Sequence, residues 1–205
     1  MTGAARRSAA PPAGRARPDG GRPGEVRLVG GRWKRSKLPV PDRPGLRPTP
    51  DRVRETLFNW LGQDLDGWRV LDAFAGSGAL GFEAASRGAA EVLLVERDPV
   101  LVRSLEASRV RLGGTAMRVE CADALVWMAR AAVMAPGGFE LVLLDPPFDG
   151  GLLPAALERA APLVVPGGWL YVEGGAPLAA VPPGFEVHRA LRAGAVHAAL
   201  LRRTG

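Results

Sequence analysis

Four acidic residues stand at the ends of successive apolar, strand-like runs. They are Asp72, Glu96, Asp123 and Asp145, and successive members are 24, 27 and 22 residues apart. Each separation is about the length of one strand–helix unit. Because the carboxyl ends of parallel strands meet at one edge of a sheet, we expect the four carboxylates to line a single binding site there.

A glycine-rich turn after the first of these strands indicates the kind of ligand. In segment 72–81 (DAFAGSGALG), Gly76 and Gly78 allow the backbone to approach a ligand, and Gly81 allows a helix to pack on the strand. The same pattern binds the pyrophosphate of nicotinamide or flavin dinucleotides, but Asp72 beside the turn would repel a phosphate. Carboxylates suit a ligand with an ammonium group, a sulfonium, a ribose diol and an adenine amine, which describes S-adenosylmethionine.

For S-adenosylmethionine, the acids have separate predicted tasks. Asp72 would face the methionine end, Glu96 would accept hydrogen bonds from both ribose hydroxyls, and Asp123 would accept from the adenine amine. For Asp123, as for Asp98, the alternative is a carboxylate that caps the following helix. Further cofactor contacts are predicted at neighbouring turn residues, namely Phe74, Ala75, Gly76, Gly78, Arg97 and Ala124.

The turn Asp145-Pro146-Pro147-Phe148 indicates the reaction. Its two prolines fix φ and remove two backbone donors, so the turn presents only acceptors, the Asp145 carboxylate and the Pro146 carbonyl. A nucleobase amine can donate to both while its ring stacks on Phe148, which directs the nitrogen lone pair at an electrophilic methyl group. We therefore predict methyl transfer to an exocyclic amine, with loss of a proton to Asp145 or solvent.

Length and composition exclude several classes of protein. The chain has 205 residues, 47% of them apolar, which fits one α/β domain with an ordinary core. The single cysteine, Cys121, excludes a disulfide framework and a structural zinc site, and two histidines leave little room for a histidine-based metal centre. With no apolar run approaching 18 residues and no apolar leader, we expect a cytoplasmic protein without a metal or a membrane span.

Positive charge is concentrated at the start of the chain. Residues 1–54 carry 12 Arg and 2 Lys against four acids, a net charge of +10, whereas residues 55–205 carry a net charge of −4. This distribution is typical of a polyanion-binding arm on a near-neutral domain. Arg-rich genome composition is the alternative, although it would favour Arg over Lys everywhere without removing acids from one segment.

The first quarter of the chain predicts a tail and a hairpin. Residues 1–24 are dense in Pro, Gly, Ala and Arg and predict a disordered basic tail. Residues 25–29 and 32–40 flank the two-residue turn signal Gly30-Gly31, and together they predict a β-hairpin.

A helix is predicted after the Pro-rich, extended segment 39–50. Thr49 is expected to cap it, with Pro50 at its first position, and the helix is expected to run over 50–62.

From residue 68 onward, strands and helices alternate. The apolar strand runs are Trp68–Ala73, Val92–Glu96, Met117–Cys121, Glu140–Leu144 and Trp169–Glu173. The helical stretches between them are 78–87, 99–112, 123–134 and 151–164. This order predicts a mostly parallel sheet with helices on both faces. Two further strands, near 185–191 and 195–202, predict an antiparallel hairpin with its turn at Gly194, which makes seven strands.

These motifs resemble those of class I S-adenosylmethionine-dependent methyltransferases that modify exocyclic amines. More closely, the chain resembles the RsmD-type 16S ribosomal RNA guanine-N2 methyltransferases of bacteria. The resemblance covers residues 25–203 and rests on the segments Val29–Trp33, Gly45–Thr49, Asp51–Leu61, Leu71–Gly81 and Asp145–Phe148.

The resemblance implies an α/β, Rossmann-like class I methyltransferase fold over residues 63–205, preceded by an RNA-binding hairpin and helix over 25–62. It implies methylation of the 2-amino group of one guanine in 16S rRNA, on the assembled or assembling 30S subunit. Nothing in the sequence demands more than a monomer, so we expect a monomer. The resemblance further implies that Arg47, Thr49 and Arg54 help to close the cofactor pocket and meet RNA phosphate.

The hairpin residues fit this placement. Arg32, Lys34, Arg35 and Lys37 can follow phosphates, with Trp33 among them as a base-stacking surface. The alternative for Trp33 is a core anchor beneath the hairpin.

Three other functions remain open at this point. A DNA adenine or cytosine amino-methyltransferase shares the Asp-Pro-Pro-aromatic turn, although 205 residues leave little room for a target-recognition domain. A nucleotide-dependent oxidoreductase could use the same fold. A non-catalytic RNA-binding assembly factor would not need the acceptor turn.

Overall fold

The computed structural model describes residues 24–43, 49–148 and 151–205. The predicted basic tail and Arg47 therefore lie outside the described residues, apart from Gly24 at the end of the tail.

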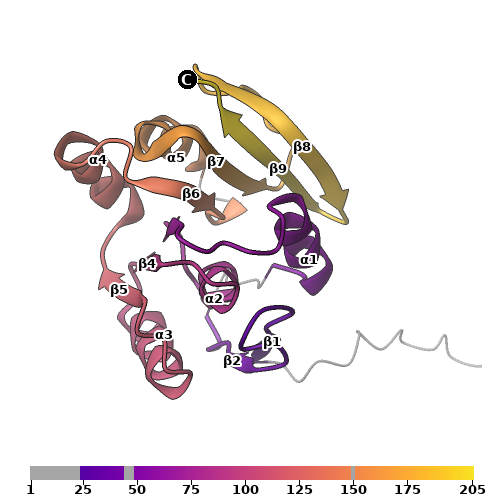
Figure 1. The fold of residues 1–205 in the computed structure, drawn as a ribbon, viewed down its shortest axis with the longest axis vertical. Helices are drawn as coiled ribbons and strands as arrows, with labels where there is room; N and C mark the ends of the chain where they lie inside the picture. Colours follow the sequence, from indigo (N-terminus) through magenta and orange to yellow (C-terminus); the bar gives the residue numbers. More distant parts are fainter. Residues whose placement is uncertain (1–23, 44–48, 149–150) are drawn as a thin grey trace, which may run out of the picture.

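A seven-stranded sheet forms the centre of the molecule, with the strand order β5-β4-β3-β6-β7-β9-β8 (Figure 1). Neighbouring strands from β5 to β7 are parallel, whereas β9 runs antiparallel to both β7 and β8. The strands are β3 (Arg69–Asp72), β4 (Glu91–Glu96), β5 (Met117–Cys121), β6 (Phe139–Leu144), β7 (Val164–Gly174), β8 (Phe185–Ala193) and β9 (Val196–Arg203). The predicted mostly parallel sheet with a C-terminal antiparallel hairpin is confirmed.

Helices cover both faces of the sheet. They are α1 (Asp51–Trp60), α2 (Ala79–Ser86), α3 (Pro99–Arg111), α4 (Ala124–Met134) and α5 (Leu153–Ala160). The predicted helix over 151–164 ends earlier, because the chain tightens into a 3₁₀ turn at Ala161–Leu163, which contains Pro162, before β7 begins.

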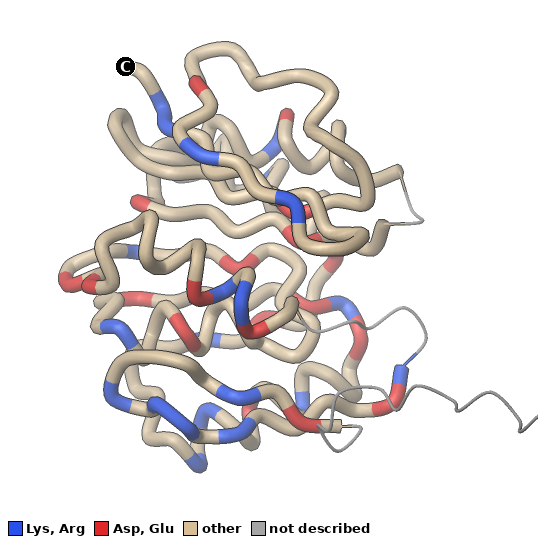
Figure 2. Tube along the Cα trace, turned by 90° about the vertical axis from the view of Figure 1, so that its right-hand side faces the viewer, with Lys and Arg blue, Asp and Glu red and all other residues tan. Residues whose placement is uncertain are grey.

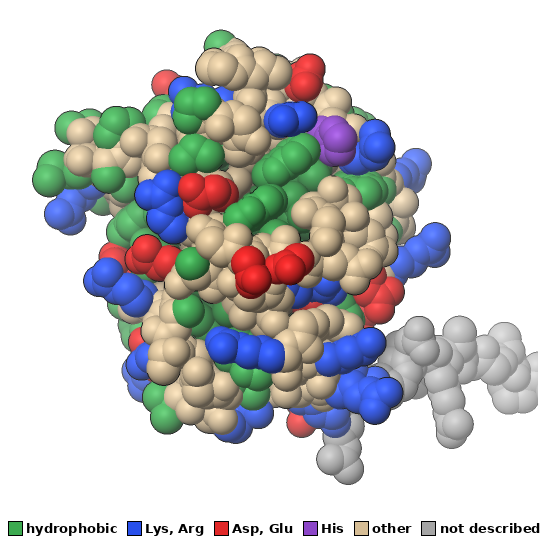
Figure 3. Space-filling model, in the orientation of Figure 1, with side chains coloured by type: hydrophobic (Ala, Val, Ile, Leu, Met, Phe, Trp, Pro, Cys, Tyr) green, Lys and Arg blue, Asp and Glu red, His purple; other side chains and the backbone are tan. Residues whose placement is uncertain are grey.

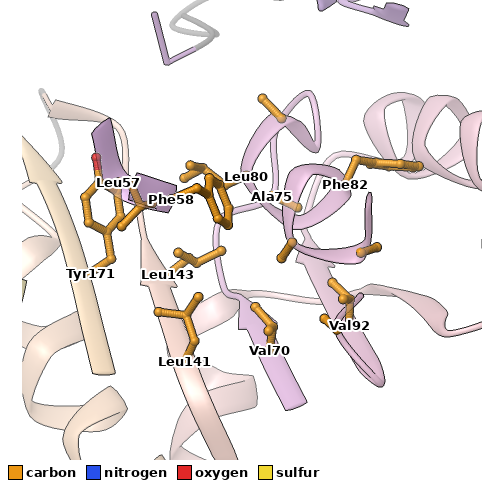
Figure 4. Packing of buried hydrophobic residues seen from close by; sticks show 14 of the residues in the cluster. Leu57, Phe58, Val70, Ala75, Leu80, Phe82, Val92, Leu141, Leu143 and Tyr171 are labelled. Atoms are coloured by element: carbon orange, nitrogen blue, oxygen red, sulfur yellow. The ribbon is translucent and has the colours of Figure 1, made fainter. Parts of the chain in front are cut away.

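Buried side chains alternate between two apolar clusters, one on each face. Along β6, Leu141 and Leu143 join the cluster with α1 and α2, whereas Val142 and Leu144 join the cluster with α4 and α5. Figure 4 shows Leu57, from α1, beside the sheet residues in the first cluster. The near-continuous apolar strands are therefore explained by burial on both faces.

The chain reverses direction across the sheet between β3 and β6. Strands β4 and β5 are added on one side of β3, and the chain then returns to place β6 on the other side. Ligands of doubly wound sheets bind at such a switch point, beyond the carboxyl ends of the strands. Asp72, the last residue of β3, and Asp145, directly after β6, flank this point.

The N-terminal hairpin differs from its prediction. Strands β1 (Glu25–Arg27) and β2 (Lys37–Pro39) are three residues long, and the connection between them is a loop over 28–36 rather than a two-residue turn at Gly30-Gly31.

This loop is held by α2 instead of by strand pairing. The Arg32 N–H donates to the Ser86 carbonyl at 2.7 Å, and the Trp33 N–H donates to the Ser86 hydroxyl at 2.9 Å. The Val29 N–H donates to the Glu83 carboxylate at 2.9 Å. Because these partners lie more than 50 residues away along the chain, local turn signals did not reveal them.

The start of α1 also differs from its prediction. The helix begins at Asp51 after Pro50, and no side chain caps it. The Thr49 hydroxyl instead donates to the Asp145 carboxylate at 3.2 Å. A tertiary partner thus replaces the local cap.

We predict that Gly31→Ala destabilises the protein more than Gly62→Ala does. Both glycines have positive φ, so each alanine should cost about 1–2 kcal/mol of backbone strain. Only at Gly31 would the added Cβ also lie 1.9 Å from the Ser86 carbonyl oxygen; at Gly62 it would meet nothing within 4 Å. Unfolding in urea measures both changes, and equal losses would contradict the tight docking of the loop on α2.

Candidate active site

A cavity of about 800 Å³ opens at the carboxyl edge of the sheet. The four acids that end successive strands, Asp72, Glu96, Asp123 and Asp145, all line it. The other predicted site residues in its lining are Thr49, Phe74, Ala75, Gly76, Arg97, Ala124, Pro146, Pro147 and Phe148. The tertiary structure therefore brings the acids together as their spacing predicted.

The glycine turn shapes one wall of this cavity. The Gly76 N–H donates to a Glu96 carboxylate oxygen at 2.9 Å, which ties the turn to the end of β4. Gly78 is absent from the lining: it begins α2 with φ +79°, and a Cβ there would meet Leu105 and Phe82. Its conformation starts α2 and allows the helix to pack, and its predicted contact with the cofactor stays a prediction.

Glu96 joins two turns of the cavity wall. Its second carboxylate oxygen accepts from the Asp98 N–H at 2.8 Å. Because each carboxylate oxygen has two acceptor positions, both oxygens keep one for a ligand hydroxyl.

Asp98 and Asp123 cap the helices that follow them. The Asp98 carboxylate accepts from the Val100 N–H at 2.7 Å, and the Asp123 carboxylate accepts from the Val126 N–H at 3.0 Å. The capping alternative is confirmed for both residues. Since both also line the cavity, capping fixes their direction without removing them from the site.

Asp72 is the buried acid nearest the glycine turn. It is 1% exposed, and its carboxylate accepts from the Gly81 N–H at 2.9 Å. A Cβ on Gly81 would lie 2.4 Å from Leu94 and 3.0 Å from the Asp72 carboxylate, so this glycine permits the contact. Burial raises the pKa of Asp72 to about 7, against the opposing effect of the Gly81 N–H.

Asp145 lies at the other side of the switch point. Burial raises the pKa of its carboxyl to about 6, while the hydrogen bond from Thr49 opposes that rise. Phe148 is 40% exposed at the cavity wall, and a Cβ on Gly175 would lie 3.4 Å from its ring. A carboxyl acceptor and a partly exposed aromatic face therefore open on the same space.

A fifth strand-end acid, Glu173, also lines the cavity. It is 1% exposed, and the Tyr171 hydroxyl donates to it at 2.7 Å. Burial, followed by the charge of Asp145, raises the pKa of Glu173 to about 8. The sequence prediction missed it, although it stands near the end of β7 and 28 residues after Asp145, which continues the spacing of the other acids.

Arg54 has a different role from its prediction. Its side chain is fully buried and donates to the Arg27 carbonyl at 2.7 Å, with the Asp51 carboxylate as a second partner. A guanidinium held inside the protein has no surface for RNA phosphate, so the predicted phosphate contact of Arg54 is wrong. Arg54 instead connects α1 with β1.

The basic residues of the 28–36 loop and β2 lie away from the cavity. The Lys37 carbonyl accepts from Arg111, the last residue of α3, whereas Asp98 and Leu101 at the start of α3 line the cavity. Thirteen helical residues separate these ends by about 20 Å. Figure 2 shows Lys and Arg positions along the chain, and Figure 3 their side chains, gathered at the end of the molecule that holds β1 and β2.

The structure confirms the alternative for Trp33, which anchors the loop in the core. It is 9% exposed, its ring centre lies 6.1 Å from that of Phe82, and the Arg32 guanidinium lies 4.3 Å above it. Because its ring is buried against α2, it has little surface for stacking on a base. Arg32, Lys34, Arg35 and Lys37 are exposed.

Within the described ranges, no group of three or more His, Cys, Asp or Glu side chains could hold a metal ion. Across the same part of the chain, every helix is too short or too polar to cross a membrane.

The strand order, the glycine turn and the acid-lined carboxyl edge define a Rossmann-like class I methyltransferase fold. Among solved structures, a putative methyltransferase from Escherichia coli is similar with a TM-score of 0.77 and 39% identity, covering 89% of this chain and 99% of that one. A putative methylase from Haemophilus influenzae has a TM-score of 0.73 and 32% identity, covering 89% and 100%.

The sequence comparisons specify the family. The family described as "Conserved hypothetical protein 95" matches residues 26–202. Ribosomal RNA small subunit methyltransferase D of Escherichia coli is 42% identical over 190 residues, which cover 88% of this chain and 91% of that protein. The chain therefore belongs to this family of methyltransferases.

We predict that the ligand-free protein loses thermal stability as pH rises from about 5 to about 7.5. Asp72 has a folded-state pKa of about 7 against an ordinary value of 3.8, so the folded state binds its proton more tightly than the unfolded state does. The stabilisation that comes from tighter proton binding by Asp72 in the folded state is complete below about pH 4. It is lost as pH rises through about 7.

The Tm of the Asp72→Asn variant should fall less than that of the wild type over this pH range. Asparagine keeps an acceptor for the Gly81 N–H but has no titrating group. Differential scanning calorimetry at constant ionic strength measures the slope, with Asp64→Asn, outside the cavity lining, as the control. A wild-type Tm that is flat or rising over this range would contradict the prediction.

Proposed function

We propose that the protein transfers the methyl group of S-adenosylmethionine to the exocyclic 2-amino group of one guanine in 16S ribosomal RNA. The observation that carries the proposal is the position of the Asp145-Pro146-Pro147-Phe148 turn. Its acceptors and its aromatic ring open on the same cavity as the acids that suit the methyl donor.

The cavity fits S-adenosylmethionine in charge and in hydrogen-bond acceptors. Acidic side chains outnumber Arg43 and Arg97 in its lining, which favours a ligand with positive sulfur and nitrogen over a diphosphate. Glu96 has free acceptor positions for a ribose diol, and the exposed Asp123 is available to an adenine amine. Asp72 would stand near the methionine ammonium, whose charge would favour ionisation of this buried acid.

When bound, S-adenosylmethionine supplies an electrophilic methyl group on a sulfonium. The Asp145 carboxylate and the Pro146 carbonyl orient the guanine amine, and the Phe148 ring supports the base. The nitrogen lone pair forms the new N–C bond as the C–S bond breaks and its electron pair stays on sulfur. The nitrogen then releases one proton, to Asp145 or to water. Asp145 also stabilises the positive charge that develops on nitrogen.

The relatives support RNA as the substrate. Besides the small subunit rRNA methyltransferase of Escherichia coli, a protein named putative rRNA methyltransferase from Bacillus subtilis is 35% identical over 132 residues, covering 64% of this chain and 72% of that protein. The exposed residues Arg32, Lys34, Arg35 and Lys37 form a surface that suits phosphates. We extend the proposal to a monomeric, cytoplasmic enzyme that acts on the assembled or assembling 30S subunit through residues 25–62.

The modified nucleoside tests this function. The protein should transfer labelled methyl from S-adenosylmethionine to 30S particles from a strain that lacks its family member, and digestion followed by mass spectrometry should identify N2-methylguanosine. Particles that already carry the modification serve as the control. N6-methyladenosine, N4-methylcytosine or no incorporation would each overturn the proposal.

Asp145→Ala should lower the rate of methyl transfer by at least about 10²- to 10³-fold, because it removes a charged acceptor that orients the amine and stabilises developing charge. S-adenosylhomocysteine should still raise the Tm of this variant, since Asp72, Glu96 and Asp123 remain. A thermal shift with NAD in place of S-adenosylhomocysteine would favour an oxidoreductase. Full transfer activity in Asp145→Ala would contradict the assigned role.

A further inference from the structure

Glu173 and Asp145 form a pair of neighbouring carboxyls in the cavity lining, at the ends of β7 and β6. Strands β6 and β7 are parallel, with Leu143 opposite Tyr171 and Leu144 opposite Val172. Asp145 and Glu173 each follow one residue later, so the register places them opposite each other and on the same face. Adjacent strands are about 4.8 Å apart, and both side chains line the cavity.

The structure holds this pair with hydroxyl groups. The Tyr171 hydroxyl donates to Glu173 at 2.7 Å, and the Thr49 hydroxyl donates to Asp145 at 3.2 Å. Tyr171 is itself fully buried. Because each carboxyl has a fixed neighbour, the pair presents acceptor oxygens in a defined arrangement instead of as mobile side chains.

We propose that Glu173 is a specificity-determining residue, which accepts a hydrogen bond from the ring N1–H of the target guanine while Asp145 accepts from its 2-amino group. This inference rests on the proposed function and names a second contact to the same base. Guanine carries these two donors side by side on its Watson–Crick edge, which flipped or unpaired bases expose to protein groups.

Paired acceptors explain why the site would choose guanine over other bases with an amine. Adenine has an unprotonated N1 beside its amine, and cytosine has an unprotonated N3. With either base, a lone pair on the ring nitrogen would face Glu173, and only a protonated Glu173 could donate to it, whereas the guanine N1–H pairs with the ionised carboxylate. A site built for a donor rejects an analogue without it, because a buried polar group then loses its partner.

The surroundings of the pair favour a ligand that brings donors. In the ligand-free protein, burial and the neighbouring Asp145 raise the pKa of Glu173 to about 8, whereas the Tyr171 and Thr49 hydroxyls and the Arg54 charge lower it. Two guanine donors would stabilise both ionised carboxyls. Base binding would therefore complete the hydrogen bonding of the pair.

The test replaces the mapped target guanine with 2-aminopurine in an otherwise identical substrate RNA. This base keeps the 2-amino group but has an unprotonated N1. Above about pH 8, where Glu173 is ionised, kcat/KM of the wild-type protein should be about 10- to 100-fold lower with 2-aminopurine than with guanine, the effect of one hydrogen bond to a charged group.

Glu173→Gln separates recognition from intrinsic differences between the two bases. Glutamine can donate to an unprotonated N1 as well as accept from N1–H, so guanine methylation should fall and the preference for guanine should shrink by tenfold or more. Tyr171→Phe removes the hydroxyl that fixes Glu173. This variant should lower the preference for guanine over 2-aminopurine by a smaller factor than Glu173→Gln does. Glu158→Gln, an exposed acid on α5 outside the cavity lining, is the matched control and should match the wild type.

Binding of S-adenosylhomocysteine, measured by calorimetry, should be equal in the wild type and in Glu173→Gln, which shows that the variant is folded. The same preference for guanine in both proteins would overturn the role of Glu173 while leaving the proposed function intact. Absence of guanine methylation by the wild type would instead overturn the proposed function.

Discussion

The burial of carboxyl groups at one edge of a parallel sheet is the constraint on which the rest of this structure depends. An ionised carboxyl removed from water is costly unless donors compensate it. Here each carboxyl has a specific donor: the Gly81 N–H donates to Asp72, the Gly76 N–H donates to Glu96, and the Thr49 hydroxyl donates to Asp145. The glycine turn and the start of α1 are therefore parts of the electrostatic environment of the cavity as well as parts of its wall.

The N-terminal segment belongs to the same core as the sheet. Val26, Leu57 and Phe58 share an apolar cluster with Leu143 and other strand residues, so the hairpin and α1 are packed on the face that also carries α2 (Figure 4). The burial of Arg54 between α1 and β1 follows from this packing. Since Thr49 lies two residues before the start of α1, the docking of that helix positions the hydroxyl beside Asp145.

Charge of opposite sign is separated along the molecule. Several acids line the cavity at the carboxyl edge, while the exposed Lys and Arg of the 28–36 loop and β2 lie at the other ends of α2 and α3, about 12 Å and about 20 Å away along the two helices (Figure 2). Under the proposed function, the methyl donor and the RNA backbone would therefore bind separate surfaces. An RNA that engages both would have to span that distance, which a structured substrate can do.

The sequence by itself determined the sheet, its helices and the meeting of four acids, because apolar periodicity and the spacing of strand–helix units are properties of the chain alone. It predicted β5 without error in its bounds and most other strands to within one or two residues, but the prediction of β7 as Trp169–Glu173 missed its first five residues. Only the tertiary structure decided that Thr49 turns to Asp145, that Arg54 and Trp33 are buried, that the 28–36 loop binds α2, and that Glu173 completes the acid group. All but the last depend on partners distant in sequence, which a local pattern does not reveal. Glu173 continues the spacing of the other acids, but its place beside Asp145 follows from the pairing of β6 with β7.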